Sequence, residues 1–124
     1  MSLTPSVLFS LLADDTRLRS LLLIHAEREL CVCELMTALE ISQPKVSRHL
    51  AALRQQRVVA TRREGNWIYY RLHPQLPGWA RDVLASAAEA SRSDGALSED
   101  HARLRAMWRH ADVGLPASRR PSET

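Results

Sequence analysis

The chain has 124 residues, of which 45% are hydrophobic and 25% charged. This size and composition predict one globular domain with a single hydrophobic core and argue against an unfolded chain. The net charge of +3 is unevenly distributed, because residues 43–80 carry seven Lys and Arg side chains against Glu64 alone, whereas residues 1–42 are net acidic. Such a basic block fits either a polyphosphate partner or a solvated surface that binds nothing.

The lengths of the hydrophobic runs and the number of cysteines indicate where in the cell the protein is expected. No apolar run reaches the roughly 20 residues that span a bilayer, and the N-terminus lacks the basic start of a signal peptide. We therefore expect a cytoplasmic protein with no membrane partner. The two cysteines, Cys31 and Cys33, are expected to be thiols because a reducing compartment disfavours disulfides.

Apolar spacing predicts three helices before residue 42. Leu8, Leu11 and Leu12 follow an i, i+3, i+4 pattern after a proline that suits a helix start. Leu18, Leu21 and Leu22 repeat the pattern after a polar break. We expect helices over residues 5–12, about 15–27, and from 32 or 34 to 40.

The next predicted helix, residues 43–56, is strongly basic. Val46, Leu50 and Leu53 share one face and are expected to pack inward, and Ser42 is expected to cap the first turn. A short turn followed by such a helix is a helix-turn-helix signature, whose second helix enters the major groove of DNA. The predicted DNA contacts are Ser42, Gln43, Lys45, Ser47 and Arg48, with His49 as a weaker candidate nearer the core.

Residues 58–72 change to the period of a β-hairpin. Glu64-Gly65-Asn66 supplies the glycine and asparagine of a tight turn, and Arg62 and Arg63 are expected at the tip. Alone, this hairpin would be a surface ribbon whose arginines keep it soluble; directly after a basic helix-turn-helix, we favour a wing. Arg62, Arg63 and Asn66 therefore join the predicted DNA contacts.

A dimeric winged helix places two recognition helices in successive major grooves. Long cationic side chains suit phosphates, and shorter polar groups or a bidentate arginine suit base edges. We assign Lys45, Arg62 and Arg63 to phosphates, and Gln43, Ser47 and Arg48 to base edges.

Two further helices are predicted towards the C-terminus. The first, over residues 77–92, has an apolar stripe suited to pairing with another helix, and the second carries Leu97, Leu104 and Trp108. Residues 116–124 are expected to form a disordered tail after a domain over residues 1–115. The predicted fold is mainly α with a β-hairpin, a winged helix-turn-helix with helical dimerisation elements at both ends.

Three blocks of the sequence resemble the ArsR/SmtB family of dimeric winged-helix metalloregulators. They are ELCVCEL at 29–35, SQPKVSRHLAALR at 42–54 and GNWIYYRL at 65–72. The resemblance implies a homodimeric repressor of operator DNA, which is not an enzyme and needs no cofactor to bind DNA. It also implies that Cys31 and Cys33 bind As(III) or Sb(III) as the inducer.

Two departures from the family matter for the inducer. Met36 stands where many relatives have a third thiol, and we expect it to be a core residue. Two thiolates then leave the third ligand to solvent or a small thiol, or favour methylarsenite. His101, His110 and Asp100 do not match the spacing of zinc or nickel sites in the family, and are expected to be solvated.

A mechanical hypothesis follows from the spacing of the cysteines. Residues i and i+2 of a helix point about 200° apart, so Cys31 and Cys33 cannot share an ion within an intact helix. Chelation would unwind the first turn, shift the short helix and tilt the following one away from DNA. The amide-rich helix start would favour the thiolates.

Two other functions remain open. The C-x-C pair could serve a redox-sensing repressor, although its spacing is not that of a disulfide oxidoreductase. The winged helix could instead be a protein interaction module whose cysteines are inert.

Overall fold

The computed structural model describes residues 3–109. Within this range the chain is mostly helical, with one three-stranded antiparallel sheet. The helices up to α5 match their predicted ranges to within two residues, and the predicted tail lies outside the described residues. In chain order the elements are α1 (Pro5–Leu12), α2 (Asp15–Glu27), β1 (Glu29–Cys31), α3 (Val32–Leu39), α4 (Gln43–Gln55), β2 (Val59–Glu64), β3 (Trp67–Leu72), α5 (Gly78–Ala90), the 3-10 turn η1 (Ser91–Ser93) and α6 (Gly95–Arg109).

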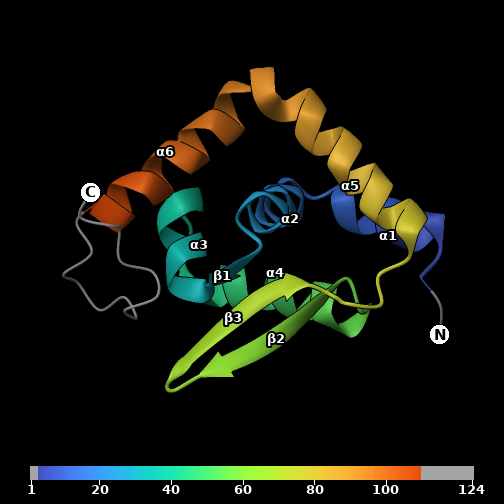
Figure 1. The fold of residues 1–124 in the computed structure, drawn as a ribbon, viewed down its shortest axis with the longest axis horizontal. Coiled ribbons are helices and arrows are strands. Elements are labelled where there is room, and N and C mark those ends of the chain that lie inside the picture. The colour runs from blue at the N-terminus through green and yellow to red at the C-terminus, as the bar shows by residue number, and fades with distance from the viewer. Residues whose placement is uncertain (1–2, 110–124) are drawn as a thin grey trace.

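Helix α2 lies at the centre of the molecule (Figure 1). Residues 21–24, Leu-Leu-Leu-Ile, are consecutive and all buried, a pattern typical of a helix covered on every side. Asp14 starts the helix by accepting a hydrogen bond from the backbone N–H of Arg17 at 3.1 Å, which satisfies one of the unpaired amides of the first turn. The hydrophobic core is built around this helix.

Strand β1 is absent from the sequence prediction, because three residues are too few to show an alternating pattern. It pairs with β3, with Leu30 opposite Tyr70 and Cys31 opposite Tyr69, and gives the sheet order β1-β3-β2. Cys31 therefore belongs to the sheet from which the hairpin extends, and α3 begins one residue after it.

The predicted hairpin is confirmed. Glu64 pairs with Trp67, so Gly65 and Asn66 form a two-residue turn. Gly65 has φ +60°, a conformation that glycine adopts without strain. Arg62 lies opposite Tyr69 in the register, further from the tip than the sequence suggests.

The helix-turn-helix consists of α3 and α4. Helix α3 ends at Leu39. The next residue, Glu40, has a left-handed backbone (φ 56°), and its N–H donates to the carbonyl of Met36. Ile41 and Ser42 complete the turn. The backbone carbonyl of Ser42 then accepts the first hydrogen bond of α4, from Val46 at 3.0 Å.

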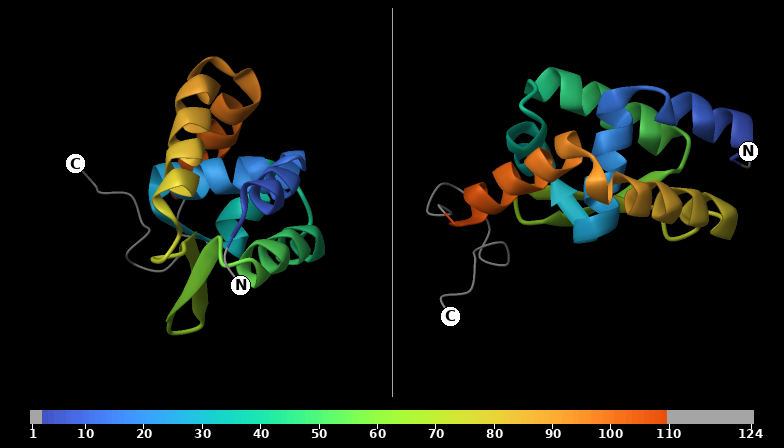
Figure 2. Two further views of the ribbon diagram at one scale, coloured as in Figure 1. Left: turned by 90° about the vertical axis from the view of Figure 1, so that its right-hand side faces the viewer. Right: turned by 90° about the horizontal axis from the view of Figure 1, so that it is seen from above.

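Helices α5 and α6 cover the side of the molecule opposite the hairpin (Figure 2). They meet at η1 and form an angled pair, with α5 packed on α2 and α6 packed on α2 and α3. One ionic cluster joins these layers. The fully buried carboxylate of Asp100 on α6 accepts hydrogen bonds from Arg19 of α2 at 2.8 and 2.5 Å and from Arg103 at 2.7 Å.

Candidate nucleic-acid interface and thiol pair

The exposed face of α4 carries the residues predicted to contact DNA. Val46, Leu50 and Leu53 are buried in the core, which turns the opposite side of the helix to solvent. Ser42 is the N-cap residue of the helix, as predicted, but its side chain does not make the expected capping hydrogen bond. Among the predicted contacts, the exposed residues of this segment are Ser42, Gln43, Lys45 and Arg48, and Ser47 is half-buried.

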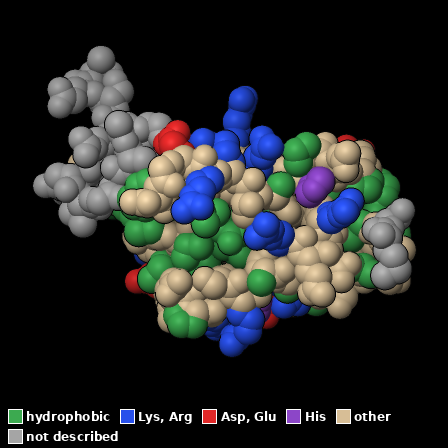
Figure 3. All heavy atoms as spheres, turned by 90° about the horizontal axis from the view of Figure 1, so that it is seen from below, with side chains coloured by type: hydrophobic (Ala, Val, Ile, Leu, Met, Phe, Trp, Pro, Cys, Tyr) green, Lys and Arg blue, Asp and Glu red, His purple; other side chains and the backbone are tan. Residues whose placement is uncertain are grey.

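Figure 3 shows the underside of the molecule, towards which α4 and the hairpin lie in Figure 1. Lys and Arg side chains are spread across its described part, and acidic side chains lie near its margins. This distribution is what the basic block over residues 43–80 predicts. A surface of this sign attracts a nucleic-acid backbone.

His49 is the exception among the α4 candidates. Its side chain is buried, 8% exposed, and turned towards α2. Arg17 donates to Nδ1 of His49 at 3.3 Å and to the carbonyl of Leu11 at 2.8 Å, and the Asp14 carboxylate lies 3.8 Å from the same nitrogen. Burial lowers the pKa of His49, and Asp14 partly offsets this. His49 thus ties α4 to the α1–α2 turn.

The two predicted arginines of the hairpin differ in their partners. Arg63 is exposed and near the turn, where it donates to the carbonyl of Gly65 at 3.2 Å. Arg62 instead donates twice to the Glu29 carboxylate of β1, at 3.0 and 2.5 Å, and stacks over the ring of Tyr69 at 4.7 Å. Arg62 therefore holds the hairpin against β1, whereas Arg63 faces solvent.

Cys31 and Cys33 lie on either side of the start of α3. Cys31 ends β1 in an extended conformation and is buried, 2% exposed, whereas Cys33 lies in the first turn of the helix and is exposed. Both are free thiols, as predicted. Cys31 lies outside the helix, in line with the predicted start at residue 32, so the separation of about 200° between residues i and i+2 of one helix does not describe this pair.

The helix start favours the Cys31 thiolate as expected, because the backbone N–H of Glu34 lowers the pKa of this thiol, but two larger effects outweigh it. Burial, and then the Glu34 carboxylate, raise the pKa of Cys31 to about 12. Partial burial and Glu34 raise the pKa of Cys33 as well. A neighbouring carboxylate and a low dielectric both disfavour a second negative charge. Both thiols are therefore protonated near neutral pH, and a ligand that takes them as thiolates must release protons.

Glu34 and Trp108 are functional candidates that the sequence reasoning missed. The buried Glu34 carboxylate accepts a hydrogen bond from the backbone N–H of Cys31 at 2.9 Å and another from the indole N–H of Trp108 at 2.7 Å. An acidic residue three positions after a helix start is a capping-box signal, which could have identified Glu34. The contact with Trp108 spans 74 residues of sequence and has no local signal.

The side chains considered as further metal or metalloid ligands, where the structure describes them, contact other parts of the protein. Met36 is half-buried and packs against the core, in line with its predicted role. The expectation that Asp100 is solvated is wrong, because it is fully buried between two arginines. His101 is half-buried, with Nδ1 3.6 Å from the Glu27 carboxylate, and His110 lies outside the described residues.

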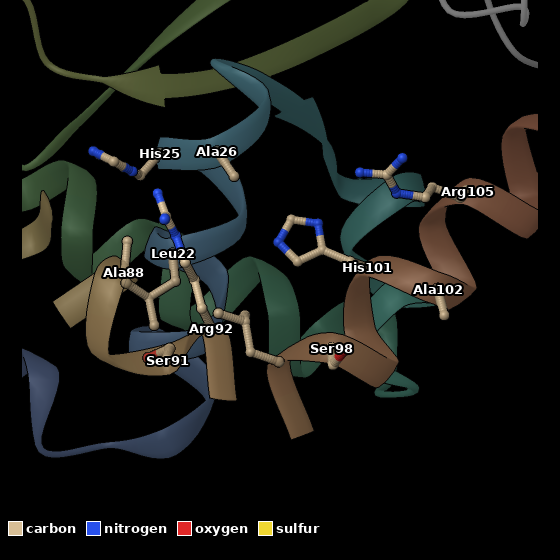
Figure 4. A pocket seen from close by; sticks show the side chains of 11 residues that line it. Leu22, His25, Ala26, Ala88, Ser91, Arg92, Ser98, His101, Ala102 and Arg105 are labelled. Carbon is tan, nitrogen blue, oxygen red and sulfur yellow. The ribbon is translucent and has the colours of Figure 1, made fainter. Parts of the chain in front are cut away.

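A pocket of about 630 Å³ lies between α2, α5 and α6. Leu22 and Leu97 contribute apolar walls, and in Figure 4 His101 projects into the pocket between Arg92 and Arg105. Over residues 3–109, no group of three or more His, Cys, Asp and Glu side chains is arranged to hold a metal ion. No helix in this range is long and apolar enough to cross a membrane.

Comparison with known proteins decides the family. The family model described as bacterial regulatory protein, arsR family, matches residues 14–61. The arsenic resistance transcriptional regulator ArsR1 of Pseudomonas putida is 53% identical over 105 residues, which cover 85% of this chain and 80% of the relative. The chain belongs to the arsR family. It is accordingly a helix-turn-helix transcriptional regulator and not an enzyme.

A further relative and two solved structures support this assignment. The arsenical resistance operon repressor of Escherichia coli is 51% identical over 85 residues, which cover 68% of this chain and 73% of the relative. Reduced HlyU from Vibrio cholerae superposes with a TM-score of 0.64 at 31% identity, covering 71% of this chain and 88% of HlyU. The AntR antimony-specific transcriptional repressor has a TM-score of 0.54 at 32% identity, and the match covers 75% of this chain and 99% of AntR. The predicted winged helix-turn-helix fold is confirmed.

Proposed function

We propose that this arsR-family regulator is a metalloid-responsive repressor. As a homodimer it binds operator DNA through α4 and the hairpin, and it leaves the operator when As(III) or Sb(III) binds Cys31 and Cys33. The observation that carries the proposal is the position of the thiol pair. Cys31 ends the strand that pairs with β3, and Cys33 lies in the first turn of α3, the helix directly before α4.

The donor atoms suit a thiophilic ligand. Thiolates select soft ions, and trivalent arsenic and antimony are thiophilic. Relatives named for arsenic resistance and for antimony-specific repression support this class of inducer. With no third side-chain ligand grouped with the thiols in the described residues, two thiolates hold the metalloid and solvent completes its coordination. Methylarsenite needs only two thiolates and belongs to the same class.

Ligand binding must rearrange the start of α3. Cys31, the last residue of β1, is buried, whereas Cys33 is exposed. To share one ion, the segment over residues 31–33 has to move, and α3 moves with it because it begins at Val32. The turn from α3 to α4 is only three residues long. The movement therefore reaches α4 directly.

The DNA-bound form is proposed to be a two-fold dimer. Phe9 on α1 is 55% exposed and Trp79 on α5 is 36% exposed, and exposed large apolar side chains suit an interface between protomers. Lys45 and Arg63 are assigned to phosphates, and Gln43, Ser47 and Arg48 to base edges; Ser42 and Asn66 stay in the proposed set. Arg62 and His49 are left out, because each binds another side chain of the protein: Arg62 binds Glu29, and His49 binds Arg17.

A redox-sensing repressor is the second candidate, and the thiol environments argue against it. Peroxide oxidises thiolates much faster than thiols, and the pKa values of both cysteines are raised. Mass spectrometry after mild peroxide treatment separates the two functions. A metalloid sensor keeps both thiols reduced under conditions in which a redox sensor forms a sulfenic acid or a disulfide.

The proposal is tested by following the anisotropy of a labelled DNA fragment from the region upstream of the gene. Arsenite or antimonite is expected to release the wild-type protein. Cys31→Ser and Cys33→Ser are expected to bind the fragment and to resist release. If arsenite occupies the thiols of the wild-type protein and operator affinity is unchanged, the proposal is wrong.

The readout by α4 has its own test. Arg48→Ala is expected to reduce the preference for operator over random DNA more than Arg63→Ala, because a base contact contributes about 1–3 kcal/mol of discrimination. Arg63→Ala is expected to weaken binding to both DNAs alike. Equal losses on both DNAs for both variants would remove Arg48 from base readout.

A further inference from the structure

Helix α6 binds α3 through side-chain contacts at both ends of α3. At the start of α3, the indole N–H of Trp108 donates to the Glu34 carboxylate at 2.7 Å. At its end, Arg103 donates to the carbonyl of Ala38 at 2.7 Å and lies 3.4 Å from the carboxylate of Glu40. The two contacts lie at opposite ends of the helix that precedes α4.

Helix α6 is itself anchored to α2 at the centre of the molecule. Asp100, on α6, is fully buried and binds both Arg19 of α2 and Arg103. Since α2 is the central helix of the core, α6 is fixed relative to it. A helix held by α6 is therefore held relative to the whole domain, and α3 cannot shift while both contacts remain intact.

The Glu34 carboxylate connects the contacts between α6 and α3 to the thiol pair. Glu34 uses Oε2 for Trp108 and Oε1 for the backbone N–H of Cys31. Bringing the buried Cys31 thiol and the exposed Cys33 thiol to one ion is expected to require a change in the backbone at residue 31. That change displaces the N–H from Glu34, and the carboxylate moves or turns within a site where its other oxygen is bound by Trp108.

We propose that α6 is a clamp that opposes induction, and that Trp108 and Glu34 form its release point. The clamp holds α3 in its DNA-binding position, and metalloid binding has to break the Trp108–Glu34 hydrogen bond. Trp108 is a positioning residue in this scheme: it contacts neither the metalloid nor DNA, and it sets the inducer concentration at which the repressor responds. The inference rests on the proposed function for its trigger.

An interaction present in only one of two states weakens any ligand that selects the other state. Trp108→Phe keeps an aromatic side chain, smaller than the indole, and removes the N–H, so it is expected to tighten arsenite binding by DNA-free protein by roughly tenfold, the scale of a hydrogen bond to a charged group. Operator affinity without arsenite is expected to stay within about twofold. Trp67→Phe, the same change in β3, is the matched control and is expected to leave arsenite binding by the DNA-free protein unaltered.

Calorimetric titration with arsenite and operator anisotropy give the two affinities. Unchanged arsenite affinity in Trp108→Phe would overturn the clamp and leave the proposed function standing. Reduced operator affinity with unchanged arsenite affinity would make Trp108 a purely structural residue and would also overturn it. Failure of the wild-type protein to bind arsenite would refute the proposed function and the clamp together.

A second readout avoids dependence on a substitution at Trp108. The chain has three tryptophans, so Trp67→Phe/Trp79→Phe leaves Trp108 as the single reporter. Its emission is expected to shift as arsenite binds, with a midpoint equal to that of binding measured by calorimetry. Emission that stays constant through saturation would show that Trp108 is not released and would contradict the clamp.

Discussion

Two residues apart in the chain, Cys31 and Cys33 have different surroundings. Cys31 is buried at the end of a strand, and Cys33 is at the surface of a helix. Their spacing identifies them as a candidate pair from sequence alone. Their difference in burial arises because β1 pairs with β3, some 40 residues later, and a pairing over that distance has no signal in the local pattern.

The first prediction concerns thiol reactivity. In the folded protein, iodoacetamide is expected to alkylate Cys33 well before Cys31, because only Cys33 is exposed. Since the pKa of each thiol is raised above its usual value, the reactive thiolate is a minor species at neutral pH. Its fraction, and with it the alkylation rate of Cys33, should rise about tenfold per pH unit up to its pKa.

Alkylation is run at pH 7 and at pH 8, and mass spectrometry of samples quenched at intervals gives the alkylation rate of each cysteine. Unfolding in guanidinium should make the two cysteines react alike. Equal labelling of both residues in the folded protein would contradict the burial of Cys31.

Arg62 and Arg63 show the same limit of sequence reasoning. Both are basic and adjacent in a hairpin, so both are predicted to contact phosphates. The structure separates them, because Arg62 pairs with Glu29 of β1 while Arg63 remains exposed. The partner of Arg62 lies 33 residues away, and nothing near the arginine indicates it.

The second prediction uses this difference. The logarithm of operator affinity falls linearly with the logarithm of salt concentration, with a slope that counts phosphate contacts. Arg63→Gln is expected to reduce the magnitude of the slope by about 1 per protomer. Arg62→Gln is expected to leave the slope within error of the wild-type value. Anisotropy titrations between about 50 and 200 mM salt give both slopes, and an equal reduction for both variants would restore Arg62 as a phosphate contact.

At the scale of elements, α3 is the part that connects the thiols to the reader helix. Its N-terminus lies next to both cysteines, its C-terminal turn leads into α4, and α6 contacts it at both ends. The helices from α1 to α5 follow the predicted ranges, because each shows a clear periodic pattern with recognisable start signals. Strand β1 and the α6–α3 contacts depend on tertiary pairing, which the pattern does not contain.

The third prediction tests the anchor of α6. Asp100→Ala leaves Arg19 and Arg103 without their buried partner. We expect a loss of about 2–4 kcal/mol in the free energy of unfolding, less than for fully buried pairs because both arginines are partly exposed. Asp15→Ala removes a different partner of Arg19, at 3.3 Å, whose side chain is 78% exposed, and should cost under about 1 kcal/mol.

Urea unfolding monitored by circular dichroism compares the two variants with the wild-type protein. Similar losses for both would mean that the buried cluster does not anchor α6.

At the scale of the whole molecule, the thiol pair proposed as the sensor and the helix proposed to read DNA share one small core. The sheet joins Cys31 to the hairpin, the turn after α3 joins Cys33 to α4, and the basic face lies opposite α5 and α6. Fold and family follow from sequence motifs and are confirmed by comparison. The coupling between the two sites is the central proposal.

Coupling between two binding sites is reciprocal. If the metalloid weakens operator binding by some factor, the operator must weaken metalloid binding by the same factor. The most direct test is therefore the dissociation constant for arsenite, measured on the free protein and on the protein saturated with operator. Arsenite is expected to bind the operator complex about 5- to 150-fold more weakly than it binds the free protein. Equal dissociation constants for the free and operator-bound protein would contradict it.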